Sequence, residues 1–107
     1  MSDFNPDVIV RLVFNFDQEG VFESGVIKTN AKSEALESII EPWLSAQLGA
    51  GKDDKEPNQQ NSYTVEIQVD LATDTFRTIS DTGNKGLTCG LVQHAFSYPE
   101  KFPIEHL

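Results

Sequence analysis

Residues 62–71 read SYTVEIQVDL, and the alternation of side chains within them decides the fold. The odd positions are apolar and the even positions are polar or charged: Tyr63, Val65, Ile67, Val69 and Leu71 against Thr64, Glu66, Gln68 and Asp70. A period of two residues is typical of a β-strand with one face on a core and the other in water. Burial of the larger apolar side chains contributes about 1.5–3 kcal/mol each, which outweighs the weak intrinsic preference of the strand. Because a slip of one residue would bury the acids, we expect one fixed register with all five apolar side chains on the core.

A second strand is predicted at residues 8–17, where one parity is apolar and the other is mixed. Its core-facing set is Val8, Val10, Leu12, Phe14 and Phe16. An acid followed by Gly20 at residues 17–20 is a turn signal, and residues 21–29 read as the returning strand of an antiparallel hairpin. Gly25 interrupts that strand, which predicts a bulge or the close approach of another backbone.

From residue 31 the apolar period changes to three and four residues, which predicts a helix that ends at Gly49. Its apolar side is formed by Leu36, Ile39, Ile40, Trp43, Leu44 and Leu48. Asn30 or Ser33 is expected to cap its start. Pro42 removes one intrahelical hydrogen bond, so we expect a kink or a break there.

The remaining chain alternates between loop composition and short periodic segments. Residues 50–61 hold no apolar side chain larger than alanine, and they predict a mobile surface loop. Residues 75–80 have a mixed pattern typical of an edge strand, and residues 85–96 have helical spacing. The tail, residues 98–107, contains two prolines and is expected to be extended, with Phe102 and Ile104 holding it to the body.

These segments predict one α+β domain over residues 1–107, in the order strand, strand, helix, strand, strand, helix. The expected architecture is a two-layer sandwich, with a four-stranded, mainly antiparallel sheet and both helices on one face. The two halves align at an offset of 55 residues, but only through their strand alternation, so a duplication is left open.

Composition and charge exclude several classes of protein. Eight basic residues stand against 17 acidic ones, and the net charge of −9 disfavours binding to nucleic acid or to an anionic membrane. One cysteine, Cys89, cannot form an internal disulfide, and no apolar stretch has the length of a signal peptide or a membrane span. We expect a cytoplasmic protein that is a monomer or a homodimer.

No motif assembles a catalytic, cofactor or metal site, which disfavours an enzyme. The tripeptide of Asp81, Thr82 and Gly83 also occurs in aspartic proteases, but Ser80 stands at an apolar position of that motif and a helical pattern follows. Cys89 and His94 lie about 140° apart around a helix, so they cannot pair as thiol and base on it. Cys89 is therefore expected to be a small core residue, and we assign no cofactor and no metal.

Two candidate sites remain. The water-facing side of the sheet carries Arg11, Asn15, Glu66, Gln68 and Asp70, together with apolar area from Ile9 and Val13 that a purely solvated face does not require. The turn before the second helix carries Asp81, Thr82, Gly83, Lys85 and Gly86, which resemble a backbone cradle for an anion without matching a phosphate-loop pattern. Close packing against the sheet or a partner helix is the favoured explanation for Gly86 and Gly90, which lie four residues apart.

The leading hypothesis is a protein-binding or regulatory module that recognises another protein through the exposed sheet face. One alternative is a small-molecule or anion-binding protein, including an enzyme, with its site at residues 81–86. The other is an acidic mimic of nucleic acid, which requires carboxylates in rows at phosphate-like spacing.

Overall fold

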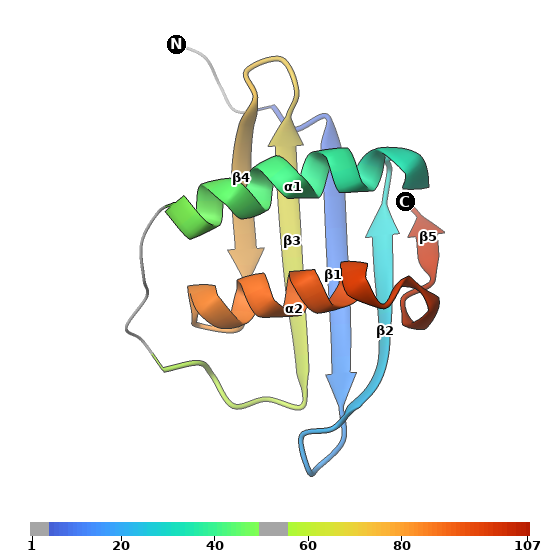
Figure 1. Ribbon diagram of the computed structural model, residues 1–107, viewed down its shortest axis with the longest axis vertical. Helices are drawn as coiled ribbons and strands as arrows, with labels where there is room; N and C mark the ends of the chain where they lie inside the picture. The colour runs from blue at the N-terminus through green and yellow to red at the C-terminus, as the bar shows by residue number, and fades with distance from the viewer. Residues whose placement is uncertain (1–4, 50–55) are drawn as a thin grey trace.

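The computed structural model describes residues 5–49 and 56–107 of the chain. Its elements follow the chain as β1 (Val8–Phe16), β2 (Phe22–Thr29), α1 (Ser33–Gly49), β3 (Ser62–Asp70), β4 (Thr75–Ser80), α2 (Lys85–Ser97), the 3-10 helix η1 (Pro99–Lys101) and β5 (Ile104–His106). Both helices lie on one face of the sheet and run across its strands (Figure 1). The predicted α+β two-layer arrangement is confirmed.

The sheet has five strands in the order β4-β3-β1-β2-β5, so the prediction of four strands is wrong. β1 pairs antiparallel with both β2 and β3, and β3 pairs antiparallel with β4, which lies at the edge as predicted. The fifth strand, β5, pairs parallel to β2, with Ile104 opposite Ile27. It was missed because three residues between Pro103 and Leu107 are too few to show a period.

The chain end is held by Phe102, which is 1% exposed. Its ring lies over Gly25, where an added Cβ would come 2.1 Å from the Phe102 Cε2 atom. The ring also meets Phe14 edge-on at 5.4 Å between centroids and stacks on Phe22 at 5.1 Å. Gly25 therefore makes room for a side chain, and not for another backbone as predicted. The irregularity in this hairpin lies instead between Asn15 and Phe16.

The core lies between the sheet and the two helices. The strands supply most of its fully enclosed side chains, and the helices add Leu36, Trp43, Val92 and Ala95. Trp43 is 0% exposed, and its Nε1 donates to the Thr78 hydroxyl at 2.7 Å, which joins α1 to the edge strand. Leu71 does not belong to this core, contrary to prediction, because β3 ends at Asp70 and Leu71 is 58% exposed in the following turn.

Both helices form where the sequence predicted them, with differences at their ends. α1 continues through Pro42, so a break there is wrong; buried Leu36, Ile40 and Trp43 hold the helix on both sides of the missing hydrogen bond. Asn30 does not cap α1, because its Oδ1 accepts from the Ile9 N–H at 2.9 Å.

The start of α2 is capped by Asn84, whose Oδ1 accepts from the Leu87 N–H at 2.8 Å. The Asn84 cap satisfies one of the amide donors that every helix leaves without a partner in its first turn.

The predicted loop at residues 50–61 is described from residue 56 onward, and residues 50–55 lie outside the described residues. The Asn58 N–H donates to the Thr82 carbonyl at 2.6 Å, and the Tyr63 hydroxyl donates to the Asn58 carbonyl. The Phe16 N–H donates to the Asn61 carbonyl at 2.7 Å. These bonds fasten residues 58–61 to the ends of β1, β3 and β4.

Candidate functional site

No described helix or strand covers the sheet face opposite the two helices, which we call the open face (Figure 1). The strand register places one row of side chains across all five strands on this open face: Ile79, Glu66, Arg11, Lys28 and Glu105. Charges of both signs thus lie side by side along the row, as in a cross-strand ladder.

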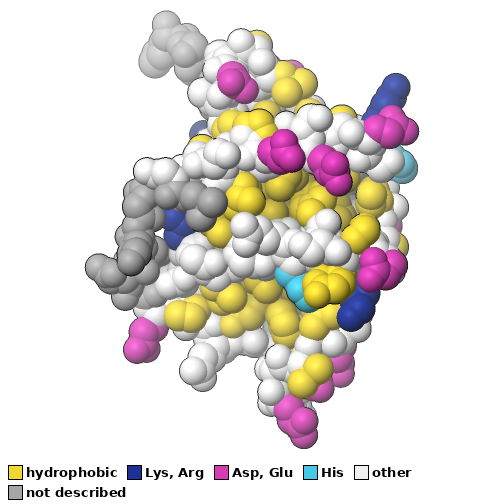
Figure 2. Space-filling view, in the orientation of Figure 1, with side chains coloured by type: hydrophobic (Ala, Val, Ile, Leu, Met, Phe, Trp, Pro, Cys, Tyr) yellow, Lys and Arg dark blue, Asp and Glu magenta, His cyan; other side chains and the backbone are white. Residues whose placement is uncertain are grey.

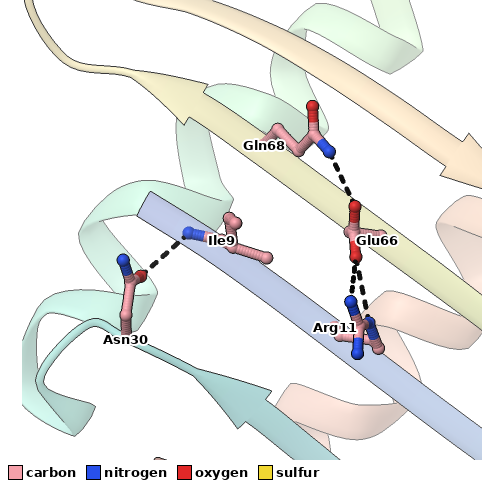
Figure 3. A network of polar contacts seen from close by, with 5 residues as sticks. All are labelled: Ile9, Arg11, Asn30, Glu66 and Gln68. Atoms are coloured by element: carbon pink, nitrogen blue, oxygen red, sulfur yellow. Dashed lines mark hydrogen bonds and ion pairs between the residues drawn. The ribbon is translucent and has the colours of Figure 1, made fainter. Parts of the chain in front are cut away.

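A hydrogen-bonded network occupies the centre of the open face (Figure 3). Arg11 donates from Nε and Nη2 to Glu66 Oε1 at 2.9 and 2.8 Å, and Gln68 Nε2 donates to Glu66 Oε2 at 2.7 Å. The Arg11 hydrogen bonds, helped by Gln68 and opposed by partial burial, hold the pKa of the Glu66 carboxyl below its usual range. Both Glu66 oxygens are therefore occupied, and the carboxylate is charged at neutral pH.

The other two predicted face residues behave differently. Asn15 remains on the face, where its Nδ2 donates to the Ser24 hydroxyl at 3.3 Å. Asp70 is 4% exposed, so its prediction as an exposed contact residue is wrong. Its carboxylate accepts from the N–H groups of Asn5 at 3.2 Å and Ala72 at 3.0 Å.

These bonds turn the Asp70 carboxylate into the β3–β4 turn. The Asn5 N–H is the largest influence on the acidity of the group, and with Thr73 and Ala72 it holds the pKa of Asp70 below its usual range despite burial. Asp70 thus fastens the turn and Asn5, which alternation alone does not reveal.

Apolar side chains interrupt the polar rows of the open face. Val13 lies opposite Val26 on one side and Thr64 on the other, and both valines are half-buried. Ile9 lies beside Gln68, while Ile79, at the edge, is 52% exposed. The face therefore offers contact area to a partner as well as charge.

The turn before α2 borders a hollow of about 400 Å³ lined with hydroxyl groups. Thr82 and Thr88 are 0% and 5% exposed, their hydroxyl oxygens are 2.6 Å apart, and each is 3.0 Å from the Ser80 hydroxyl. Both threonine hydroxyls also donate to the Asn84 carbonyl, at 2.9 and 3.0 Å. The cluster satisfies its own hydrogen-bonding groups and ties β4 to α2.

The predicted anion-site residues have mainly structural contacts. The Asp81 carboxylate accepts from the Thr64 N–H at 2.8 Å, so it points to β3. The amides of Thr82 and Asn84 already donate to Ser80 and Thr82 hydroxyls at 3.2 Å. Gly83 has a φ of 73°, a conformation that favours glycine, and Lys85 lines the hollow.

Gly86 and Gly90 do not pack against the sheet, so the predicted packing there is wrong, whereas packing against a partner helix stays a prediction. A Cβ added at Gly86 would approach only the Asn84 Oδ1 at 3.2 Å, and one at Gly90 would meet nothing within 4 Å. Both residues lie on the exposed side of α2.

Cys89 is 6% exposed, which confirms it as a core residue. Burial raises the pKa of the Cys89 thiol, with a smaller opposing effect of Lys85, so the thiol is protonated at neutral pH. His94 lies within ring-contact distance of Phe22, Tyr98 and Phe102, and its buried Nε2 has no hydrogen-bond partner among the described residues.

The sequence reasoning missed a groove between α1 and α2. It comprises two hollows of about 410 and 340 Å³ that share Glu37 and Phe96. Hydrophobic side chains line the bottom of the hollow between the helices, and acidic side chains lie along its α1 border (Figure 2). The sequence feature that could have indicated this groove is the spacing of Glu34, Glu37 and Glu41 at three and four residues, which places them on one side of a helix.

Within residues 5–49 and 56–107, no helix is long and apolar enough to cross a membrane, and no group of three metal-ligating side chains gathers. No protein-family model, curated protein or solved structure matches this chain.

Proposed function

We propose that this protein is a binding module that recognises another protein through the open face of its sheet. The main support is the composition of the open face of the five-stranded sheet. This face combines exposed Ile79 and half-buried Val13 and Val26 with charged side chains of both signs. Interfaces between proteins pair such apolar contacts with a polar surround that sets orientation.

The charged row supports a protein as the ligand. Arg11 and Lys28 are neighbours across β1 and β2, and Glu66 and Glu105 lie beyond them on either side. This interleaving differs from the continuous carboxylate rows that a nucleic-acid mimic requires. A partner with charges of both signs complements it directly. Cytoplasmic action remains part of this proposal, in keeping with one reduced cysteine.

The proposal is tested by replacing the exposed apolar contact without touching the core. Ile79→Arg changes a side chain that is 52% exposed, and Ser45→Arg on the other layer makes the same change of charge at an exposed site. A tagged copy is purified from its native cells, and the captured proteins are quantified by mass spectrometry. We expect Ile79→Arg to lose a partner that Ser45→Arg retains, with both melting temperatures near that of the unmodified protein. Equal capture by all three proteins overturns the proposal.

We propose anion binding at residues 81–86 as a second candidate, favoured by the hollow of about 400 Å³ at the start of α2. Helix starts favour negative charge, and Lys85 lines this hollow. Inorganic phosphate should then raise the melting temperature of the protein, and Lys85→Met should remove the rise. No rise with up to millimolar phosphate overturns this candidate.

A further inference from the structure

We propose that the groove between α1 and α2 binds a basic amphipathic helix of another protein. This site lies on the helical layer and is independent of the open sheet face.

The groove has the shape and lining of a helix-binding site. α1 and α2 lie side by side across the sheet with opposite directions (Figure 1). Residues of both helices line the groove. Its floor is apolar: buried Ile40 and Val92 close it at the bottom, half-buried Leu44 and Phe96 are partly accessible, and the floor continues past buried Ala95 in the other hollow. Such a floor accepts apolar side chains spaced at three and four residues along a helix.

The charge of α1 specifies the polar side of the ligand. Glu34, Glu37 and Glu41 all line the groove and are exposed, and α1 contains no lysine, arginine or histidine. No described cation forms an ion pair with any of the three. The opposite flank of α1 carries Ala35, Pro42 and Ala46, which have no charge.

This one-sided acidic row is unfavourable for the isolated helix. Like charges at spacings of three and four residues cost about 0.2–0.5 kcal/mol per pair, although Glu34 in the first turn gains from the helix dipole. A row of Lys or Arg on a bound helix would neutralise it. A second copy of this chain would instead place acidic rows against each other, and a nucleic acid or anionic lipid would add further negative charge.

The α2 border of the groove permits close approach. Gln93 and Ser97 are exposed and uncharged there, and the space around Gly90 is open to 4 Å. A bound helix can therefore settle near α2 with its small or apolar side and direct its cations toward α1.

The probe is a synthetic helical peptide of about 18 residues, matched to the length of α1. It carries leucines at three- and four-residue spacing and lysines on one flank. One control peptide has the same composition in scrambled order, and another has glutamate in place of lysine. Binding is measured by fluorescence anisotropy at physiological salt, because screening suppresses unspecific attraction between net charges.

Two variants with equal charge change separate the groove from the net charge of −9. Glu37→Lys with Glu41→Lys reverses the groove border, and Glu19→Lys with Glu23→Lys reverses two exposed acids outside it. We expect the first variant to bind the lysine peptide about tenfold more weakly than the second, and both to keep the circular dichroism of the unmodified protein. The scrambled and glutamate peptides should bind more weakly than the lysine peptide.

Amide chemical shifts locate the peptide. Changes should concentrate on α1 and α2, and Ile79→Arg should bind the peptide as the unmodified protein does, so this proposal and the proposed function fail separately. The proposal is overturned if the two double-lysine variants lose the same affinity for the lysine peptide, or if the scrambled peptide binds as tightly as the lysine peptide. It is also overturned if the chemical-shift changes are confined to the open sheet face. A dimer found by sedimentation whose formation excludes the lysine peptide overturns it too.

Discussion

Replacing Gly25 by alanine tests how the end of the chain is held. The added Cβ would lie 2.1, 2.5 and 2.9 Å from three atoms of the Phe102 ring, and all three distances are shorter than real Cβ contacts allow. The ring cannot yield easily, because Phe102 is 1% exposed and contacts both Phe14 and Phe22. We therefore expect a large loss of stability from one methyl group.

Its magnitude is bounded by two known effects. Overpacking a core costs about 1–3 kcal/mol, and complete loss of the ring, as in Phe102→Ala, costs about 3–5 kcal/mol. Alanine recovers about 0.5–1 kcal/mol of backbone entropy relative to glycine in a strand. Gly25→Ala should thus lower the free energy of unfolding by about 1–3 kcal/mol. In the Phe102→Ala background it should cost nothing or stabilise slightly.

Urea unfolding of the four proteins measures this coupling. Trp43 is the only tryptophan and is 0% exposed, so its fluorescence reports loss of the core. We expect the two substitutions to be strongly non-additive, with a coupling energy above about 1 kcal/mol. If Gly25→Ala costs the same with and without the Phe102 ring, the ring does not lie over Gly25 and the account of the chain end is refuted.

Substitutions at three further positions test single features of the structure. Gly90→Ala should raise the free energy of unfolding by about 0.5–1 kcal/mol, because the added methyl meets nothing within 4 Å; a loss in urea unfolding would contradict this. Asn84→Ala removes the cap of α2 and should cost about 0.5–2 kcal/mol, whereas Asn84→Ser should retain most of it. The stability that Asp70 contributes is complete above the pKa of the carboxyl in the unfolded chain, and it is lost as the pH falls through the lowered pKa of the folded protein. Asp70→Asn should therefore lower the melting temperature at pH 7 and flatten the acid side of the stability profile, and an unchanged profile would count against the contacts of Asp70.

Alternation was sufficient to predict the strands that contribute whole faces to the core. The side chains of Val65 and Ile67 are 0% exposed, as their parity required. The same reasoning failed at the strand end, where Asp70 is buried and Leu71 is exposed. Alternation predicts burial only while a strand continues. At the end of the strand, hydrogen bonds to the following turn determine which side chains are buried.

Contacts between distant segments account for most of what was missed. The sequence marks Gly25 as unusual, but the reason is a ring 77 residues away. The acidic spacing on α1 is visible in the sequence, whereas its position beside α2 follows only from the layer arrangement. Arg11 and Glu66 were predicted only to share the water-facing side of the sheet, and they form an ion pair because their strands are antiparallel neighbours.

Exchanging the central ion pair of the open face tests the proposed function most directly. Arg11→Glu with Glu66→Arg keeps the composition, the net charge and an ion pair at the same place, and reverses the charge pattern that a partner would read. We predict a free energy of unfolding within about 1 kcal/mol of the unmodified protein. The partner captured by the unmodified protein should bind the exchanged protein at least tenfold more weakly. Equal affinity of that partner for the two folded proteins would contradict recognition through the open face.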